Sequence, residues 1–236
     1  MHAFDGIYNR AAERKGGEST LKLLLPAALT PEQLAATDAS RFLAEMARCL
    51  FQAGFVWRVI NQKWGGFEEV FHGFDPDAVL SLSAEEWDEI ASDKRIVRNG
   101  QKVRAVRANA HFIDEITFEY GSFSRFIADW PCADLTGLLT LLKKRGSRLG
   151  GSTGPRFLRN VGKDTFVLSH DVVRCLQESG VEIADNPTSK RDLTQVQQTF
   201  NAWHQQSGLP YSHLSKIAAY SVGENNPVEI ILKNSA

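Results

Sequence analysis

The chain has 236 residues, of which 43% are hydrophobic, 23% charged and 10% aromatic, as in a globular protein with a substantial buried core. Its formal net charge is -1, so a nucleic-acid partner would need a local basic surface. No run approaches the roughly 18 apolar residues of a membrane span, and the first residues lack the regions of a secretory signal. Three well-separated cysteines, Cys49, Cys132 and Cys175, suit reduced thiols. The sequence therefore predicts a soluble, cytoplasmic protein.

Apolar residues recur at intervals of three and four along most of the chain, which indicates helices. Residues 5–16 predict a first helix, and residues 38–60 predict a longer amphipathic helix. Caps at Thr30, Asp75 and Ser83 begin shorter helices. The remaining helical patterns cover residues 103–113, 122–130, 136–144, 155–161, 164–179, 188–206 and 211–222, and the tail to residue 236 has no clear assignment.

No alternation of period two continues for more than a few residues, and the chain contains no repeats. The sequence therefore predicts an all-α fold, a bundle of about ten helices. We expect one domain over residues 1–236, in which residues 180–236 form a C-terminal helical extension that packs on the N-terminal helix.

Residues 143–158 combine a basic cluster with a glycine-bearing hairpin between two helices, the second of which has Pro155 near its first position. Backbone N–H groups in such a turn, together with a helix N-terminus, form a site for an anion, typically a phosphate. Flanking cations favour a phosphate of nucleic acid, although an ordinary helical corner with a solvated basic rim would give the same pattern. The residues expected at the DNA backbone are Lys143, Lys144, Arg145, Gly146, Gly151, Ser152, Thr153 and Gly154.

Further motifs occur in order along the chain. Gln52-Ala53-Gly54 precedes Trp57, and the segments 71–76, 96–110 and 172–173 follow at characteristic spacing around the hairpin. Over residues 5–176 this ordered set resembles the DNA-3-methyladenine glycosylase I family, which belongs to the helix-hairpin-helix glycosylases. The resemblance implies a two-lobed helical fold with a cleft between the lobes. It also implies hydrolysis of the N-glycosidic bond of alkylated purines, chiefly 3-methyladenine, in double-stranded DNA after base flipping.

The resemblance also implies a base pocket around Trp57, which matches the family tryptophan that packs against the flipped base. The alternative for Trp57 is that it is a core aromatic residue on an amphipathic helix. Tyr8 is similar to a pocket tyrosine of the family, and the alternative is that it packs in the core. The family has a glutamate at the position of Cys49, and a thiol cannot accept the hydrogen bonds of a carboxylate. Glu45, one turn earlier, is the candidate substitute, with a solvated or salt-bridged glutamate as the commoner explanation. The pocket residues expected are Trp57, Tyr8, Cys49, Phe51, Gln52 and Ser169.

In the wider superfamily a catalytic aspartate lies about two turns after the second helix of the hairpin motif, where this chain has Ser169-His170-Asp171. We therefore predict Asp171, or else Glu45, as the catalytic carboxylate. The alternative is that Asp171 caps the following helix. Pro155 stands where lyase-competent relatives have a Schiff-base lysine, and this predicts a monofunctional hydrolase.

Many members of the family bind zinc through residues near both ends of the domain. Here His2 and the pair Asp171 and Cys175 do not supply the four nitrogen or sulfur ligands of a tetrahedral site, so we expect no metal and no other cofactor.

Two other hypotheses remain open. Because Cys49 and Ser169 replace acidic residues, the protein could be a catalytically weak or inactive relative that binds DNA non-specifically, as a damage sensor or architectural protein. The third hypothesis is a helical interaction domain that does not bind DNA. For the first hypothesis, we expect a monomer whose partner is double-stranded DNA with alkylated bases, without a membrane association.

Overall fold

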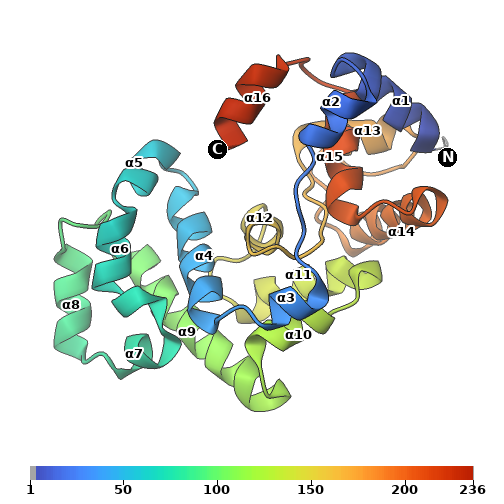
Figure 1. Ribbon diagram of the computed structural model, residues 1–236. Coiled ribbons are helices and arrows are strands. Elements are labelled where there is room, and N and C mark those ends of the chain that lie inside the picture. The colour runs from blue at the N-terminus through green and yellow to red at the C-terminus, as the bar shows by residue number, and fades with distance from the viewer. Residues whose placement is uncertain (1–3, 236) are drawn as a thin grey trace. The chain divides into compact units, whose positions relative to one another are not determined.

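The computed structural model describes residues 4–235, except for the side chains of residues 234 and 235 (Figure 1). These residues form sixteen α-helices and two short 3-10 helices, without a β-strand among them. Ten of the α-helices have eight residues or more. The predicted all-α class is therefore confirmed. No helix in the described range is long and apolar enough to cross a membrane.

The chain forms two compact units. Unit 1 is drawn from residues 1–28, 131–136 and 164–236, and unit 2 from residues 29–130 and 137–163. His2 lies outside the described residues.

Unit 1 has a core in which aromatic rings meet. Phe4 and Trp203 lie with their ring centroids 5.3 Å apart, and Phe200 contacts both Trp203 and Phe166. Helix α1 packs against α14 and α15, and α13 packs against α15. The α-helices of the unit are α1 (Phe4–Arg14), α2 (Glu18–Leu23), α13 (His170–Glu178), α14 (Lys190–Ser207), α15 (Tyr211–Ser221) and α16 (Val228–Ser235).

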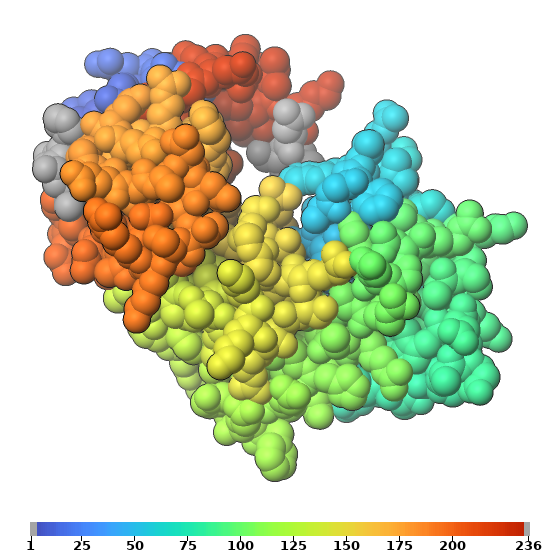
Figure 2. Space-filling model, turned by 180° about the vertical axis from the view of Figure 1, so that it is seen from behind, coloured from blue at the N-terminus to red at the C-terminus, as the bar shows by residue number. Residues whose placement is uncertain are grey.

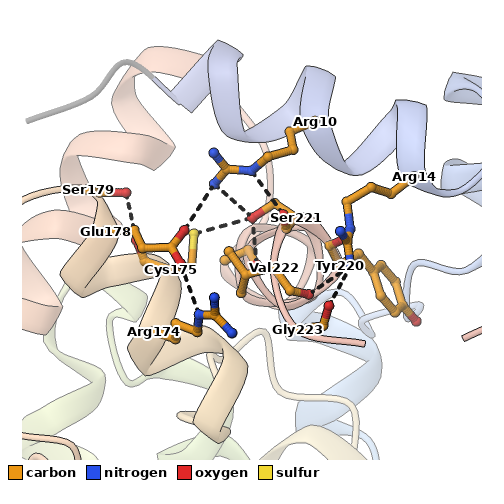
Figure 3. A network of polar contacts seen from close by, with 11 residues as sticks. Arg10, Arg14, Arg174, Cys175, Glu178, Ser179, Tyr220, Ser221, Val222 and Gly223 are labelled. Atoms are coloured by element: carbon orange, nitrogen blue, oxygen red, sulfur yellow. Dashed lines mark hydrogen bonds and ion pairs between the residues drawn. The ribbon is translucent and has the colours of Figure 1, made fainter. Parts of the chain in front are cut away.

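Cations on α1 bind the C-terminal end of α15 (Figure 3). Arg10 Nε donates to the carbonyl of Ser221 at 2.9 Å, and Arg14 donates to the carbonyls of Tyr220 at 2.9 Å and Gly223 at 2.6 Å. The last carbonyls of a helix have no partner within it and carry its negative dipole end, so guanidinium groups stabilise them. These contacts, which we call the α1 clamp, join the first helix of the unit to α15.

Unit 2 is built around α9, against which α4, α7, α8 and α10 pack. Phe42, Phe112 and Phe157 are fully buried there, and edge-to-face contacts join Phe42 and Phe112 through Phe123. The α-helices that lie in this unit are α3 (Pro31–Ala35), α4 (Ala39–Gln52), α5 (Trp57–Gln62), α6 (Trp64–Val70), α7 (Pro76–Ser81), α8 (Ala84–Ser92), α9 (Gly100–Tyr120), α10 (Phe123–Asp129), most of α11 (Leu135–Arg145) and α12 (Thr153–Asn160).

The continuous helix predicted over residues 38–60 is wrong, because α4 ends at Gln52 and α5 begins at Trp57. Gly54 has a φ of 76°, which a helix does not allow. Lys102 Nζ donates to the carbonyls of Phe51 at 3.2 Å and Ala53 at 2.6 Å, so a buried ammonium caps the end of α4. The chain consequently turns outward, and Trp57 lies at the surface.

The predicted helix starts are confirmed where a side chain caps them. Thr30, Asp38, Asp75 and Ser83 each accept an N–H from the first turn of their helix, and Thr30 and Ser83 form complete capping boxes. The helix after the hairpin begins at Thr153, two residues earlier than predicted. Two short helices without a strong pattern, α2 and α16, were not predicted from the sequence.

Candidate functional site

The hairpin joins α11 to α12 through residues 146–152, and α9 holds it in place. The Oδ1 atom of Asn109 accepts the backbone N–H of Ser147 at 2.7 Å, and its Nδ2 donates to the carbonyl of the same residue at 3.2 Å. Asn109 is fully buried, so one side chain satisfies two backbone groups of the turn in a dry environment. The hairpin is therefore fixed to the longest helix of unit 2.

The turn packs inward through Leu149, which is only 1% exposed. A Cβ at Gly154 would lie 2.5 Å from the carbonyl oxygen of Leu149, and a Cβ at Gly146 would lie 2.5 Å from its Cδ1 atom. Gly151 has a φ of 59°, in the left-handed region that favours glycine. Three of the predicted glycine positions are thus required by the shape of the turn.

The outer side of the turn exposes backbone N–H groups. Gly151 and Ser152 are exposed, and within the described residues their N–H groups donate to no protein acceptor. Ser152 precedes α12 without a side-chain cap, and Thr153 is the first residue of the helix. Free N–H groups at a helix N-terminus can bind an anion.

The predicted basic residues differ in what they contact. Lys143 and Lys144 are exposed on the last turn of α11 (yellow-green to yellow in Figure 2). Arg145, in contrast, donates to Glu119 at 2.6 and 2.8 Å and to Glu115 at 3.1 Å. These two acidic partners raise the pKa of the Arg145 guanidinium. Arg145 therefore has an intramolecular role in addition to the predicted DNA contact, for which Lys143 and Lys144 are better placed.

Trp57 is 48% exposed, so it is not the core aromatic of the alternative interpretation. The guanidinium carbon of Arg156 lies 4.5 Å from the centroid of its ring. This distance is typical of a cation–π contact. Arg156 lies on α12, one turn after the hairpin, so the same helix contacts the candidate base-stacking residue and begins at the candidate phosphate site.

Cys49 and Glu45 lie one turn apart on α4, and Asn160 of α12 contacts both. The Oε1 atom of Glu45 accepts Asn160 Nδ2 at 2.7 Å and the Cys49 thiol at 3.5 Å. Burial and the Glu45 carboxylate raise the pKa of Cys49 far above its usual value, so Cys49 is a neutral thiol. The carboxylate of this region is therefore supplied by Glu45.

A pocket of about 220 Å³ opens beside Glu45. Its apolar lining includes Leu29 and Val161, and its charged lining consists of Arg41, Arg48, Glu45 and Glu68, with Asn160 at the α12 side. Arg41 and Glu68 form an ion pair at 3.2 Å, and Arg48 lies over the ring of Trp64 at 4.2 Å. The pocket thus presents both hydrogen-bond donors and acceptors.

Two other residues of unit 2, Phe51 and Gln52, were predicted for the base pocket, and both are buried in the interior of the unit. Phe51 is fully buried and contacts the ring of Phe67 at a centroid distance of 4.6 Å. Gln52 is 6% exposed and donates to Asn61 at 3.3 Å. Both residues support the turn that carries Trp57.

Tyr8, Ser169 and Asp171 belong to unit 1. The Tyr8 hydroxyl donates to Glu18 at 3.0 Å, and Ser169 caps α13 by accepting the N–H of Val172. The capping role considered for Asp171 is therefore wrong, because Ser169 performs it. The Asp171 side chain is 42% exposed in the first turn of α13 and lies close to Gly223.

Among the described residues that match the zinc ligands of the family, Cys175 does not fit that metal. The Cys175 thiol lies 3.4 Å from the Ser221 hydroxyl, and burial raises its pKa, whereas zinc requires a thiolate. Arg10 and Arg14 bring positive charge to the same region (Figure 3). No group of three histidine, cysteine or acidic residues within the described range could hold a metal ion.

Two residues of this site were missed from the sequence. Arg156 and Asn160 are four residues apart and therefore share one side of α12. The signal for them was weak, because neither belongs to the motifs and only the packing of α12 against α4 directs them toward Trp57 and Glu45.

Comparison with known proteins agrees with the motifs. The sequence model of the methyladenine glycosylase family matches residues 34–136. DNA-3-methyladenine glycosylase 1 of Escherichia coli strain K12 is 32% identical over 59 residues, which are 25% of this chain and 32% of that relative. The match thus spans about a third of the relative's length.

Solved structures of 3-methyladenine DNA glycosylase I are also similar. The enzyme from Staphylococcus aureus has a TM-score of 0.48 at 25% identity, and the match covers 65% of this chain and 90% of that one. A variant in complex with 3-methyladenine has a TM-score of 0.46 at 28% identity, covering 53% and 77%. The resemblance inferred from the motifs is confirmed, as a distant similarity to the methyladenine glycosylase family over residues 34–136.

Proposed function

We propose that the protein is a monofunctional DNA glycosylase that hydrolyses the N-glycosidic bond of alkylated purines after base flipping. The observation that carries this proposal is the position of α12, which begins at the hairpin and places Arg156 on the exposed ring of Trp57. The hairpin binds a backbone phosphate without reading sequence. Trp57 lies beside the hairpin helix and is 48% exposed, so its ring is suited to stacking an extruded base.

Two carboxylates are candidates for stabilising the positive charge that develops as the bond breaks. Glu45 lines the pocket of unit 2, and Asp171 is partly exposed in unit 1. A fixed carboxylate stabilises such charge most strongly where water is excluded. The Glu45 side chain is 17% exposed and the Asp171 side chain 42%, which favours Glu45.

The buried lysines support hydrolysis without a lyase step. Lys102 and Lys163 each donate to two backbone carbonyls at a helix end, so neither ammonium group is placed as an amine nucleophile. The partner in this proposal is double-stranded DNA with alkylated bases, and the protein acts as a monomer in the cytoplasm, without a cofactor.

The test is the release of free bases from methylated duplex DNA, measured by chromatography with the protein in excess. We expect release of methylated purines by the wild type and slower release by Trp57→Ala. A wild type that releases no base contradicts the proposal.

Cys49 favours a second candidate function, that of an inactive relative which binds DNA non-specifically. The residue is a neutral, buried thiol where the family resemblance implies a glutamate. Absence of base release together with binding of abasic-site DNA that weakens steeply with salt would support this candidate.

A further inference from the structure

The hydrogen-bond donors of Arg156 have no acceptor in the part of the chain that the structure describes. The side chain is half-buried on α12, and it forms neither a hydrogen bond nor an ion pair there. Glu45, the carboxylate at the end of α12, is bonded instead to Asn160 at 2.7 Å and paired with Arg48 at 3.5 Å. A guanidinium group carries five N–H donors. Those of Arg156 are therefore left for water or for a ligand.

The ring of Trp57 holds this guanidinium group in place. The guanidinium carbon of Arg156 lies 4.5 Å from the ring centroid. A cation over the face of a ring keeps its N–H groups for other acceptors, and a guanidinium matches two oxygens of one phosphate. Because Trp57 already restricts the side chain, Arg156 loses less conformational freedom when it binds such a group.

The hairpin offers a first phosphate site at the start of the same helix. The backbone N–H groups of Gly151 and Ser152 lie at the N-terminus of α12 and, within the described residues, donate to no protein acceptor. A Cβ at Gly150 would lie 3.2 Å from the Cγ atom of Lys143, so the stem of Lys143 lies against the turn. This side chain brings a positive charge to the turn. Together these groups favour an anion at the hairpin.

Arg156 lies beyond this first site along α12. Ser152 and Arg156 are four residues apart, about 6 Å along the helix axis at 1.5 Å per residue. A DNA strand carries one phosphate per nucleotide, and most protein–DNA hydrogen bonds go to the backbone. A strand that places one phosphate at the hairpin therefore brings a neighbouring phosphate within reach of Arg156.

We propose that Arg156, held over Trp57, binds a backbone phosphate next to the one at the hairpin, on the same DNA strand. The inference rests on the proposed function only in taking DNA as the ligand. It gives Trp57 a second role, because the ring positions the guanidinium group in addition to the base stacking proposed above. A phosphate contact carries no sequence information, so Arg156 acts on undamaged and damaged DNA alike.

The first experiment is a fluorescence-anisotropy titration of an undamaged duplex oligonucleotide at several salt concentrations. Arg156→Gln should lower the slope of log affinity against log salt by about 0.9, and adding Lys143→Ala should lower it by about 1.8 in total, as for two separate phosphates. Arg156→Lys should keep the slope but bind more weakly, because an ammonium group lacks the planar fork.

Arg107→Gln is the matched control. Arg107 also lies over a tryptophan ring, that of Trp87, at 5.6 Å. It is two residues from Asn109, which binds the hairpin, so the two side chains do not share a side of α9. The slope and the affinity should be unchanged in this variant.

The second experiment tests whether Trp57 acts through Arg156. Trp57→Leu should weaken binding of the undamaged duplex about two- to fivefold, which is the size of an exposed cation–π contact. In the Arg156→Gln background the same change should have no effect, because the guanidinium group that the ring positions is gone. The bases of this duplex are all paired, so the stacking of an extruded base does not contribute.

An unchanged slope in an Arg156→Gln variant that is folded by circular dichroism overturns the inference. So do slope losses that do not add, an equal effect of Trp57→Leu with and without Arg156, and a wild type that does not bind the duplex. Base release from methylated DNA is measured separately. A wild type that releases bases while Arg156→Gln keeps the slope has the proposed function without this contact. One that shows the contact but releases nothing binds DNA without the activity.

Discussion

Asn109 and Ser147 form a two-point contact that fixes the hairpin to α9, with a 2.7 Å bond to the backbone N–H of Ser147 and a 3.2 Å bond from the Asn109 amide to its carbonyl. The contact joins residues 38 positions apart in the sequence. This contact explains how a turn with three glycine positions keeps one shape. The Asn109 side chain, which lies outside the turn, binds the backbone of Ser147 and so restricts its movement.

Asn109→Ala should therefore loosen the hairpin. Removing the partner of two backbone groups should destabilise unit 2 by about 1–3 kcal/mol, and DNA affinity should fall with it. Thermal unfolding and fluorescence-anisotropy titration with duplex DNA measure the two effects. Asn9→Ala, a change of an exposed residue on α1, is the control. Unchanged stability would show that the contact does not hold the turn.

Alanine variants of Lys143, Lys144 and Arg145 should differ in the salt dependence of their DNA affinity. Lys143→Ala and Lys144→Ala should each lower the slope of log affinity against log salt by about 0.9, as for the loss of one phosphate contact, with unchanged stability. Arg145→Ala should mainly lower the unfolding temperature, because its partners Glu115 and Glu119 lose their cation. Equal slopes for all three variants would contradict this assignment.

Trp57→Ala should reduce single-turnover base release about 5–150-fold, which corresponds to the roughly 1–3 kcal/mol of one base–aromatic stack. Stability should change little, since the ring is half exposed. Phe118→Ala removes an aromatic side chain that is 91% exposed and should leave release unaltered. If both variants behave alike, Trp57 does not stack the base.

Cys49 should make the protein less stable in alkali. Burial and the nearby Glu45 raise the pKa of the native thiol above the 9.0 of an ordinary cysteine, so above this pH the native state binds a proton that the unfolded state loses. The free energy of unfolding then falls by about 1.4 kcal/mol per pH unit. Chemical denaturation of the wild type and Cys49→Ala between pH 8 and about 10.5 should show a shallower decline in the variant. Parallel curves would mean that Cys49 ionises freely.

Arg14→Ala should release the C-terminal end of α15 and the residues after it, because each hydrogen bond from this charged donor to the carbonyls of Tyr220 and Gly223 contributes about 1.5–3 kcal/mol when buried and less when exposed. Amide exchange of the residues that follow α15 should accelerate in the variant.

A chelator should have no effect on the stability of the wild type, since the α1 clamp uses no metal. Destabilisation by the chelator would show that a metal contributes after all.

The sequence predicted those features that depend on near neighbours. The caps at Thr30, Asp75 and Ser83 lie within three residues of their partners, and apolar spacing located most of the long helices correctly. The end of α4 at Gln52 was not predicted, because Phe55, Val56 and Trp57 continue the apolar pattern. The group that caps this helix end, Lys102, comes 49 residues after Ala53 in the sequence.

The candidate site was predictable only in part for the same reason. Family motifs identified Trp57 and the hairpin, and they singled out Cys49 as a departure. Nothing near Arg145 in the sequence indicates its partner Glu115, which precedes it by 30 residues. The pairing of Glu45 with Asn160 spans 115 residues and depends on α4 packing against α12.

The eight residues of α12 fix a distance as well as a set of contacts. Thr153 begins the helix at the hairpin and Asn160 ends it beside Glu45, about 10 Å away at 1.5 Å per residue. The helix therefore sets the distance between the hairpin, where we propose that a phosphate binds, and the pocket. Adding one residue to the helix would rotate everything beyond it by about 100°, and the pocket would no longer face the same direction relative to the proposed phosphate site.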